Sequence, residues 1–492
     1  LLAFHAVSTT IFFQQQSFFM LSCANHGNES GVMQQIPEWS FLVNSPITTP
    51  VPATMKRRPG VLINRNFALL WLGQTISFTG DFVFDTILVL WVASTIAKGQ
   101  PWAPLAVSGV VFMAALPAFI VAPIAGVLVD HWDNKRGTML RMHCFSIVLI
   151  LLLFPLTGLV PLPLIVGGQL PVGWKLAAIY AVALLIGSIA QFFNPAEVAL
   201  LSDIVDVPER TRATGLHTLM INLASLLGPI VGAFLYFALG VQSVLLLNIL
   251  SFAVALLAIL AIRIPQTGGE QAERRQAAQN GGLLRGFVDG LRFFGSNRVL
   301  LTLLITGVLL EFGGTMRNTL GVFFLVQNLH AAENLYGVLG TAFGAGLILG
   351  AIIVSYLAQR IGRARTYWFS AIVLGILTIV FARQTSFVPA VVVMFCQGLI
   401  NSGTEVIMIA LVIQVAPRDF IGRVLSVFTL VYGLSWMISA FLAGYLASAV
   451  LHNFHAVVFG IVFGPLDTLF IAVGIMAIAS GVYAMLTLRG QM

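Results

Sequence analysis

Charged residues are scarce in this chain: only 9% of its 492 residues are Asp, Glu, Lys or Arg, whereas 58% are hydrophobic. A soluble domain carries about 25% charged residues, so a water-soluble globular fold is excluded. The alternation over about ten positions that marks the strands of a membrane barrel is also absent. Apolar runs of about 20 residues recur instead, and each is long enough to cross ~30 Å of hydrocarbon as a helix. The composition therefore predicts a polytopic membrane protein of the all-α class.

Motifs of metal and phosphate chemistry are lacking too. The three cysteines, Cys23, Cys144 and Cys396, are widely separated, and no CxxC pair or Cys/His cluster occurs, so we expect neither a disulfide framework nor a zinc site. Walker A, HExxH and GxSxG sequences are absent, so an ATP-driven pump and an intramembrane hydrolase lack their usual groups. We expect a protein that is not an enzyme and uses no cofactor or metal. A receptor-like or structural role is left open, although it would give the acidic residues inside the membrane no task.

Twelve apolar spans can be delimited in the sequence. The longest charged interval, residues 263–299, is a linker that separates the sixth span from the seventh, as expected of two fused six-helix bundles. Residues 55–262 then form an N-terminal bundle and residues 300–492 a C-terminal bundle. The spans are 67–97, 104–129, 138–160, 175–200, 214–239, 242–262, 300–326, 337–358, 366–382, 388–414, 422–449 and 465–488.

The first 54 residues stand apart because they contain no Lys or Arg and begin with Leu. A secretory signal peptide needs a positively charged start, which is missing. Met55 is followed by three basic residues, the charge expected ahead of a first helix anchored at the cytoplasmic side. We interpret residues 1–54 as a disordered tail or an over-extended gene start, with Met55 as the true first residue.

Basic residues are distributed unevenly between the two sides of the membrane. The net charge of +7 would indicate nucleic-acid binding in a soluble protein. With twelve spans, however, only Lys98, Lys175 and Arg383 lie on one side and Arg317 within the membrane, while the other basic residues fall on the opposite side. The positive-inside rule makes that opposite side cytoplasmic. We therefore expect a monomer in the lipid bilayer of the inner (plasma) membrane, with both termini cytoplasmic and no nucleic-acid partner.

A short charged turn follows the second span and carries the most specific pattern in the chain. Its spacing of Gly, Leu, Asp and two basic residues resembles the motif between helices 2 and 3 of the major facilitator superfamily of transporters. His131 and Asp133-Asn134 depart from the family's usual residues. The matching residues are Gly126, Leu128, Asp130, Lys135 and Arg136.

The resemblance implies the major facilitator fold, which is polytopic and all-α, with twelve transmembrane helices in two six-helix pseudo-repeats. The turn after the eighth span, Gln359–Arg365, is a weaker echo of the turn after the second. Two parallel repeats place a substrate cavity at their interface near the middle of the membrane.

We interpret the turn after the second span as a conformational latch. A carboxylate that ends an apolar helix needs a partner or a task, because an unpaired charge near lipid is costly. Asp130 can cap a helix N-terminus of the opposite half and pair with Arg141, and Glu197 near the end of the fourth span can complete the charge cluster. The alternative is a solvated turn without such a role.

The fifth span carries small residues and a proline at spacings that resemble the signature of the superfamily's antiporters. Proline removes one backbone hydrogen bond and bends a helix, and small residues let a neighbouring helix approach closely. A tight, kinked helix contact limits leakage, which favours export over uptake. The residues are Gly215, Ala224, Gly228, Pro229, Gly232 and Ala233.

Three further stretches are similar to one branch of the superfamily, the macrolide-efflux and enterobactin-exporter-like group. They are residues 66–81, which include Gly80-Asp81, residues 192–196 and residues 248–252. The resemblance runs from Met55 to the end of the chain. It implies export of bulky amphipathic compounds driven by protons.

Two carboxylates in the first span are candidates for proton coupling. Asp81 lies about 14 residues into the span, or ~21 Å along a helix, which is near mid-membrane. Asp85 lies one turn further on the same face, and two such carboxylates cannot both be charged cheaply. We expect one of them to carry a proton. The alternative is a structural pair held by backbone groups.

Other ionisable residues inside the spans are functional candidates as well. Glu311 and Arg317 are six residues apart on the seventh span, about 9 Å along the helix, which is poor for a direct pair. Arg317 can instead be a charge partner of Asp85 in the opposite half. Glu405 is either a second proton site or a contact to a neighbouring helix.

Neutral side chains of the fourth and fifth spans are candidates for lining the substrate cavity. They are Gln191, Phe192, Asn194 and Asn222. The fourth span has no arginine, whereas many drug and sugar transporters of the superfamily carry one there. Proton coupling then depends on the carboxylates.

The sequence thus predicts a secondary active transporter that exports amphipathic small molecules, of drug, macrolide or siderophore type, in exchange for protons by alternating access. The alternative on the same fold is an uptake symporter or facilitator of a small solute.

Overall fold

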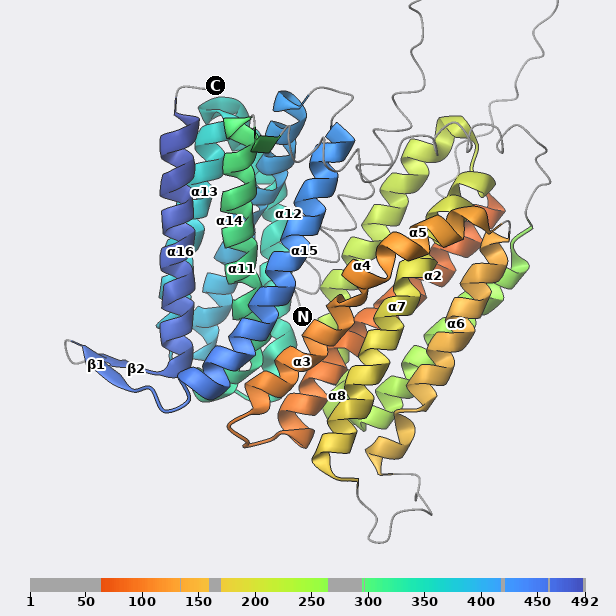
Figure 1. The fold of residues 1–492 in the computed structure, drawn as a ribbon, viewed down its shortest axis with the longest axis horizontal. Helices are drawn as coiled ribbons and strands as arrows, with labels where there is room; N and C mark the ends of the chain where they lie inside the picture. Colours follow the sequence, from red (N-terminus) through yellow and green to blue (C-terminus); the bar gives the residue numbers. More distant parts are fainter. Residues whose placement is uncertain are drawn as a thin grey trace, which may run out of the picture.

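The computed structural model describes residues 63–132, 134–158, 170–263, 294–295, 297–416, 421–458 and 461–489. Residues 1–54, interpreted above as a tail or an over-extended gene start, lie outside the described residues, as does most of the linker 263–299. Eleven helical segments of the described chain are long and apolar enough to cross a membrane. They form two bundles that lie side by side (Figure 1).

The N-terminal bundle contains the helices up to residue 261. These are α2 (Arg65–Trp91) with its continuation η2 (Val92–Ile96), α3 (Ala103–Ala115), α4 (Pro117–Ile120), α5 (Ala122–His131), α6 (Lys135–Leu151), η3 (Phe154–Thr157), α7 (Val172–Ile204), η4 (Val207–Glu209) and α8 (Arg210–Ala261).

The C-terminal bundle contains the helices from residue 298 onward and one short hairpin. These are α11 (Arg298–Gln327), η5 (Glu333–Leu335), α12 (Tyr336–Ile361), α13 (Arg363–Ala382), α14 (Phe387–Val415), α15 (Ile421–Tyr445) with its continuation η7 (Leu446–Val450), strands β1 (Ala456–Val458) and β2 (Ile461–Phe463), and α16 (Pro465–Leu488).

Helix α8 contains two of the predicted spans. Its backbone leaves the helical region at Gly240, which has φ 79° and ψ 167°, a conformation that favours glycine. The segments on either side of Gly240 run antiparallel, because the start of one and the end of the other both contact the beginning of α2. The indole nitrogen of Trp71 donates to the carbonyl of Leu216 at 2.9 Å, and the amide of Asn66 donates to the carbonyl of Arg263 at 2.7 Å. Residues 210–239 (the first arm) and 241–261 (the second arm) therefore cross separately, and the expected twelve helices are present.

The helix ends define two faces of the molecule. We call the face where α2 begins the Arg65 end; the amide of Asn64 donates there to the carbonyl of Ile204, the last residue of α7. We call the opposite face, which holds the loop after η2, the Lys98 end. Figure 1 shows α16 running from the β1–β2 hairpin to the opposite face of the molecule.

The second predicted span, 104–129, is not one continuous helix. The structure divides it into α3, α4 and α5, with the first break just before Pro117. Proline has no N–H for the helical ladder and its ring crowds the preceding turn. Gly187 of α7 packs at this break, where an added Cβ would lie 2.5 Å from the carbonyl oxygen of Ala114.

Helix α2 lies between the two arms of α8, and glycines permit the close approach. A Cβ on Gly228 would lie 2.4 Å from Cβ of Phe82, and one on Gly80 would lie 2.3 Å from Oγ of Ser251. Small residues allow helices without other driving forces in lipid to pack through backbone contact. The contact with both arms of α8 holds α2 in place in the N-terminal bundle.

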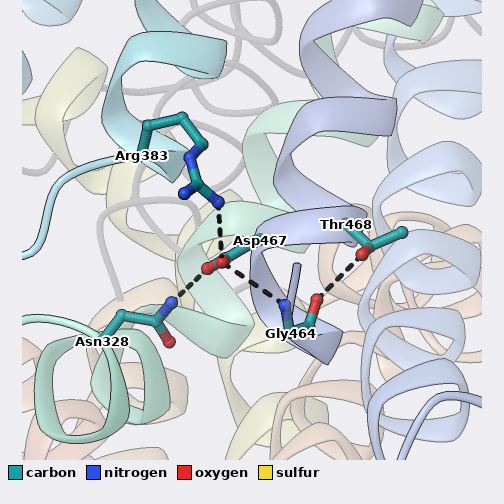
Figure 2. A network of polar contacts seen from close by, with 5 residues as sticks. All are labelled: Asn328, Arg383, Gly464, Asp467 and Thr468. Atoms are coloured by element: carbon teal, nitrogen blue, oxygen red, sulfur yellow. Dashed lines mark hydrogen bonds and ion pairs between the residues drawn. The ribbon is translucent and has the colours of Figure 1, made fainter. Parts of the chain in front are cut away.

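A polar network at the Lys98 end holds three helices of the C-terminal bundle together (Figure 2). The Asp467 carboxylate in the first turn of α16 accepts from Asn328 after α11, from Nη1 of Arg383 after α13 at 3.1 Å, and from the backbone N–H of Gly464 at 3.4 Å. The Arg383 guanidinium also lies 5.0 Å from the ring centroid of Phe463 in β2. The network therefore joins the hairpin, which the pattern of apolar runs does not predict, to the bundle.

We predict that Gly228→Ala lowers the free energy of unfolding by about 1–3 kcal/mol, because the new methyl group overpacks the contact with Phe82. Gly215→Ala in the same helix is the matched control, since an added Cβ there meets nothing within 4 Å. The melting temperature of each purified variant in detergent measures the effect. Equal melting temperatures would contradict the packing described here.

Candidate functional site

A cavity of about 250 Å³ lies between the two bundles and is walled mainly by the N-terminal one. Helices α2, α3, α6 and α7 supply most of its lining. The C-terminal bundle contributes Asn318, Thr319, Gly433 and Trp436.

Asp81 and Asp85 both line this cavity. They lie one helical turn apart near the middle of α2 and its continuation, which run from Arg65 to Ile96. The close contact of Gly80 with Ser251 holds this part of α2 against the second arm of α8. Asp81 interacts electrostatically with both Asp85 and Glu197. The structure thus brings three carboxylates together in an apolar interior, where every added negative charge is costly.

Glu197 and His217 form a buried pair that the sequence does not reveal. Oε1 of Glu197 lies 3.0 Å from Nε2 of His217, and both side chains are almost fully buried. α7 continues to Ile204, so Glu197 lies about two turns inside the helix rather than at its end. Its expected cluster with Asp130 and Arg141 stays a prediction, because the Asp130 side chain lies outside the described residues.

Gln191 and Asn194 line the cavity as expected, but Phe192 does not. Its ring stacks on Trp132 instead, with centroids 5.9 Å apart and planes 15° from parallel. Successive helical residues point about 100° apart, so Phe192 faces away from the side of α7 that holds its neighbours Gln191 and Asn194. Phe193 lines the cavity in its place. The side chain of Asn222 lies outside the described residues.

The acidic residues of the C-terminal bundle form a second, separate cluster. Glu311 interacts electrostatically with Arg317 and Glu405, and Glu405 accepts a hydrogen bond from the Asn401 amide at 2.7 Å. The guanidinium of Arg317 lies 5.3 Å from the ring centroid of Phe343.

The expected ion pair between Arg317 and Asp85 is therefore wrong for this conformation. Among the described residues no ion pair joins the two side chains; Arg317 lies over an aromatic ring of its own bundle and Asp85 faces the cavity. A single sequence fixes the depth of each residue along its helix, but not the rotation of the two bundles relative to each other.

The charged turn after α5 lies at the Arg65 end. Lys135 donates to the carbonyl of Val129, and Arg136 donates to the carbonyls of Ile259 and Leu260, at 3.0 and 2.5 Å. Both basic residues thus bind carbonyl groups at helix C-termini, which the helix dipole favours. Arg141 is exposed. The side chain of Asp130 and the surroundings of Gly126 lie outside the described residues.

The small residues of the first arm of α8 face two different neighbours. Gly228 and Gly232 face α2; a Cβ on Gly232 would lie 3.0 Å from Cβ of Thr86. Pro229 faces the other bundle, where a Cβ on Gly337 of α12 would lie 3.0 Å from its carbonyl oxygen. Gly215 touches neither neighbour. Apart from its first residue, the predicted antiporter-like motif thus packs on one side against α2 of its own bundle and on the other side against α12 of the C-terminal bundle.

Contacts between α3 and α15 join the bundles at the Lys98 end. Oγ of Ser448 accepts a hydrogen bond from the backbone N–H of Leu105 at 3.1 Å. A Cβ on Gly444 would lie 2.2 Å from Oγ of Ser108. Figure 1 shows the ribbons of the two bundles meeting near α3 and separating toward the Arg65 end. The contacts described between the bundles lie nearer the Lys98 end than the Arg65 end.

The arrangement of the cavity is that of a transport protein: two bundles, a central cavity with carboxylates, and contact at one end. A comparison with protein families matches residues 60–477 to the family described as transmembrane secretion effector, of the major facilitator type. The chain belongs to this family. The resemblance to the major facilitator superfamily is thereby confirmed, and the protein is a transporter of that superfamily.

Similar proteins include several efflux transporters. YkuC of Bacillus subtilis, an uncharacterised transporter of major facilitator type, is 24% identical over 312 residues, 61% of this chain and 66% of that protein, just under two thirds of its length. Macrolide efflux protein A of Streptococcus pyogenes is 22% identical over 78% of this chain and 90% of that protein. The multidrug efflux pump Tap of Mycobacterium tuberculosis is 24% identical over 68% of this chain and 77% of that protein.

Solved structures show the same fold at low sequence identity. The nucleoside transporter NupG superposes with a TM-score of 0.59 at 11% identity, covering 86% of this chain and 99% of that one. A bacterial homologue of the iron transporter ferroportin in an inward-facing state superposes with a TM-score of 0.60 at 15% identity, covering 85% of this chain and 98% of that one. The predicted fold class, twelve helices in two six-helix repeats, is therefore confirmed.

We predict that Gly444→Val separates the bundles at the Lys98 end, because its side chain overlaps Ser108 and the carbonyl of Pro104. Spin labels on Lys98→Cys and Asn453→Cys, in a background without native cysteines, report the distance by electron–electron double resonance. In Gly444→Val we expect the population with the longer distance between the two labels to become the major one. Gly314→Val, at a glycine with nothing within 4 Å of an added Cβ, is the control. An unchanged distance distribution in Gly444→Val would show that this contact does not hold the end closed.

Proposed function

We propose that this transporter exports amphipathic small molecules in exchange for protons by alternating access. The observation that carries the proposal is the pair Asp81 and Asp85, which lines the cavity between the bundles. A carboxylate in an apolar cavity binds a proton readily, because its charged form is poorly solvated. A proton carrier needs such a group within reach of both faces of the membrane in turn.

The distribution of basic residues supports the orientation of this cycle. Among the described residues, Arg65, Arg136, Arg263, Arg298 and Arg363 all lie at the Arg65 end, and the few at the other end include Lys98 and Arg383. By the positive-inside rule the Arg65 end is cytoplasmic. The protein then lies in the plasma membrane with cytoplasmic termini, and the conformation described is open toward the cytoplasm.

Two observations favour export over uptake. The relatives named for function are a macrolide efflux protein and a multidrug efflux pump. The close approach of Gly337 in α12 to the carbonyl of Pro229 is the kind of tight contact that would limit leakage between the bundles, and the contacts of Gly228 and Gly232 with α2 hold this helix in place.

The coupling scheme assigns separate tasks to the two bundles. Asp81 and Asp85 take up protons from the outside and release them to the cytoplasm, and the charged form of the pair favours substrate binding from the cytoplasmic side. In the C-terminal bundle, Glu311, which interacts with both Arg317 and Glu405, serves together with Glu405 as a second proton site. Asp130, with Gly126, Lys135, Arg136 and Arg141, acts as the latch that selects between the two open states.

The domain organisation completes the proposal. Residues 55–262 and 300–492 form the two moving bundles, and the linker 263–299 joins them in the cytoplasm. The protein acts as a monomer with no cofactor and no nucleic-acid partner.

The direction of transport can be tested with membrane vesicles. We expect ethidium to accumulate in inverted vesicles that contain the protein when their interior is acidified. Uptake that occurs only in right-side-out vesicles would favour the alternative, a symporter or facilitator of a small solute; the fold is shared with a nucleoside transporter and so allows both directions.

We predict that Asp81→Asn abolishes proton-driven efflux of ethidium, because an amide cannot bind and release a proton at this depth. The measurement is ethidium accumulation in inverted vesicles under an imposed proton gradient. Asp206→Asn is the matched control, since Asp206 is exposed in the turn between α7 and η4. The coupling assignment is wrong if efflux survives both Asp81→Asn and Asp85→Asn.

A further inference from the structure

Two buried polar side chains in the cavity wall are not used by the proton scheme. Gln74 of α2 is 1% exposed, and neither its amide nitrogen nor its oxygen has a hydrogen-bond partner in the described structure. His143 of α6 is 3% exposed, and its Nε2 likewise lacks a partner among the described residues. Both residues line the cavity.

The two side chains lie within about two helical turns of each other along the bundle. Gly73 of α2 packs on Ala258 of the second arm, and Gly80 packs on Ser251. Phe252 therefore lies about level with the stretch of α2 that follows Gln74. The ring of His143 is 5.3 Å from that of Phe252 and 4.8 Å from that of Phe193 on α7.

Unpaired polar atoms at such positions need an explanation. Buried donors and acceptors in folded proteins are almost always paired, because an unpaired group loses its hydrogen bonds to water and gains none from the protein. An apolar residue would fill either position at no such cost. Their placement on a cavity wall indicates that the partner is a molecule that enters the cavity.

The charge and shape of the cavity narrow the chemistry of that molecule. Asp81 and Asp85 supply negative charge, and none of the described lining residues is Lys or Arg. Aromatic rings, including those of Phe78, Phe193 and Phe252, make up much of the wall. Aromatic faces and carboxylates together favour an organic cation with an apolar body.

We propose that Gln74 and His143 form a hydrogen-bonding subsite for a hydroxyl or carbonyl group of the transported compound, which is an amphipathic organic cation whose ammonium group lies against Asp81 and Asp85. The inference rests on the proposed export function and names its substrate class. A hydroxyl suits the subsite because it both donates and accepts, as the Gln74 amide and a neutral imidazole do. Such a subsite discriminates against cations without a polar group, since its own polar atoms then stay unpaired.

Two probe cations separate the subsite from the carboxylates. Quinine is a protonated amine with a hydroxyl group, and tetraphenylphosphonium is a permanent cation without hydrogen-bonding groups. Equilibrium binding of each probe is measured on the full-length protein in lipid nanodiscs. The variants are Gln74→Met, which keeps the side-chain length, and His143→Phe, which keeps an aromatic ring. Gln74→Leu and His143→Leu are second choices if either fails to fold.

We predict that each subsite variant weakens quinine binding about tenfold, as for the loss of a hydrogen bond in a buried site, and leaves tetraphenylphosphonium within about twofold. Unchanged tetraphenylphosphonium binding also shows that the variant is folded. Asp81→Asn is expected to weaken both probes. Gln100→Leu and His452→Leu, at exposed residues of the Lys98 end, are the matched controls.

Unchanged quinine binding in both subsite variants, or an equal loss for both probes, would overturn the subsite. Binding of neither probe by the unmodified protein would overturn the substrate class. The export proposal fails separately: if the contrast between the probes is found but no proton gradient drives quinine into inverted vesicles, the subsite stands and the coupling does not.

Discussion

The contact of α2 with both arms of α8 determines the geometry of the N-terminal bundle. Glycines at positions 80, 228 and 232 let the backbones approach so closely that an added Cβ would overlap a neighbour. Lipid offers helices no hydrophobic reason to associate, so this close packing is a main source of cohesion. It also fixes the rotation of α2, and through it the direction in which Gln74, Asp81 and Asp85 face. The cavity thus depends on residues that have no side chain.

The two bundles repeat the same architecture but divide the chemistry unequally. The N-terminal bundle gives the cavity its carboxylates, its buried histidine and most of its aromatic wall. The C-terminal bundle keeps Glu311, Arg317 and Glu405 in a cluster of their own, with Arg317 over Phe343. The cavity carboxylates and the second charge cluster therefore belong to different bundles.

The sequence predicts the helices well because a membrane span is defined by length and hydropathy. The last predicted span, 465–488, coincides with α16. The depth of Asp81 follows from counting residues along α2. Helix rotation is harder to predict, because spans that are apolar all round show no polar face. For that reason the sequence does not show that Phe192 faces away from the cavity, or that Glu197 pairs with His217. A histidine in an apolar span was the available signal, for His143 and His217 alike.

The hydrogen bond from Leu105 to Ser448 has a consequence for the solvent. The N–H of Leu105 is one of the first-turn donors of α3 that no carbonyl of its own helix can satisfy, and its partner comes from the other bundle. When the Lys98 end opens, this donor and the Ser448 hydroxyl must each be hydrated, and when it closes they must be stripped of water again. In the proposed alternating-access cycle, every turnover would then take up and release water at a helix terminus, so the balance between the two open states would depend on water activity.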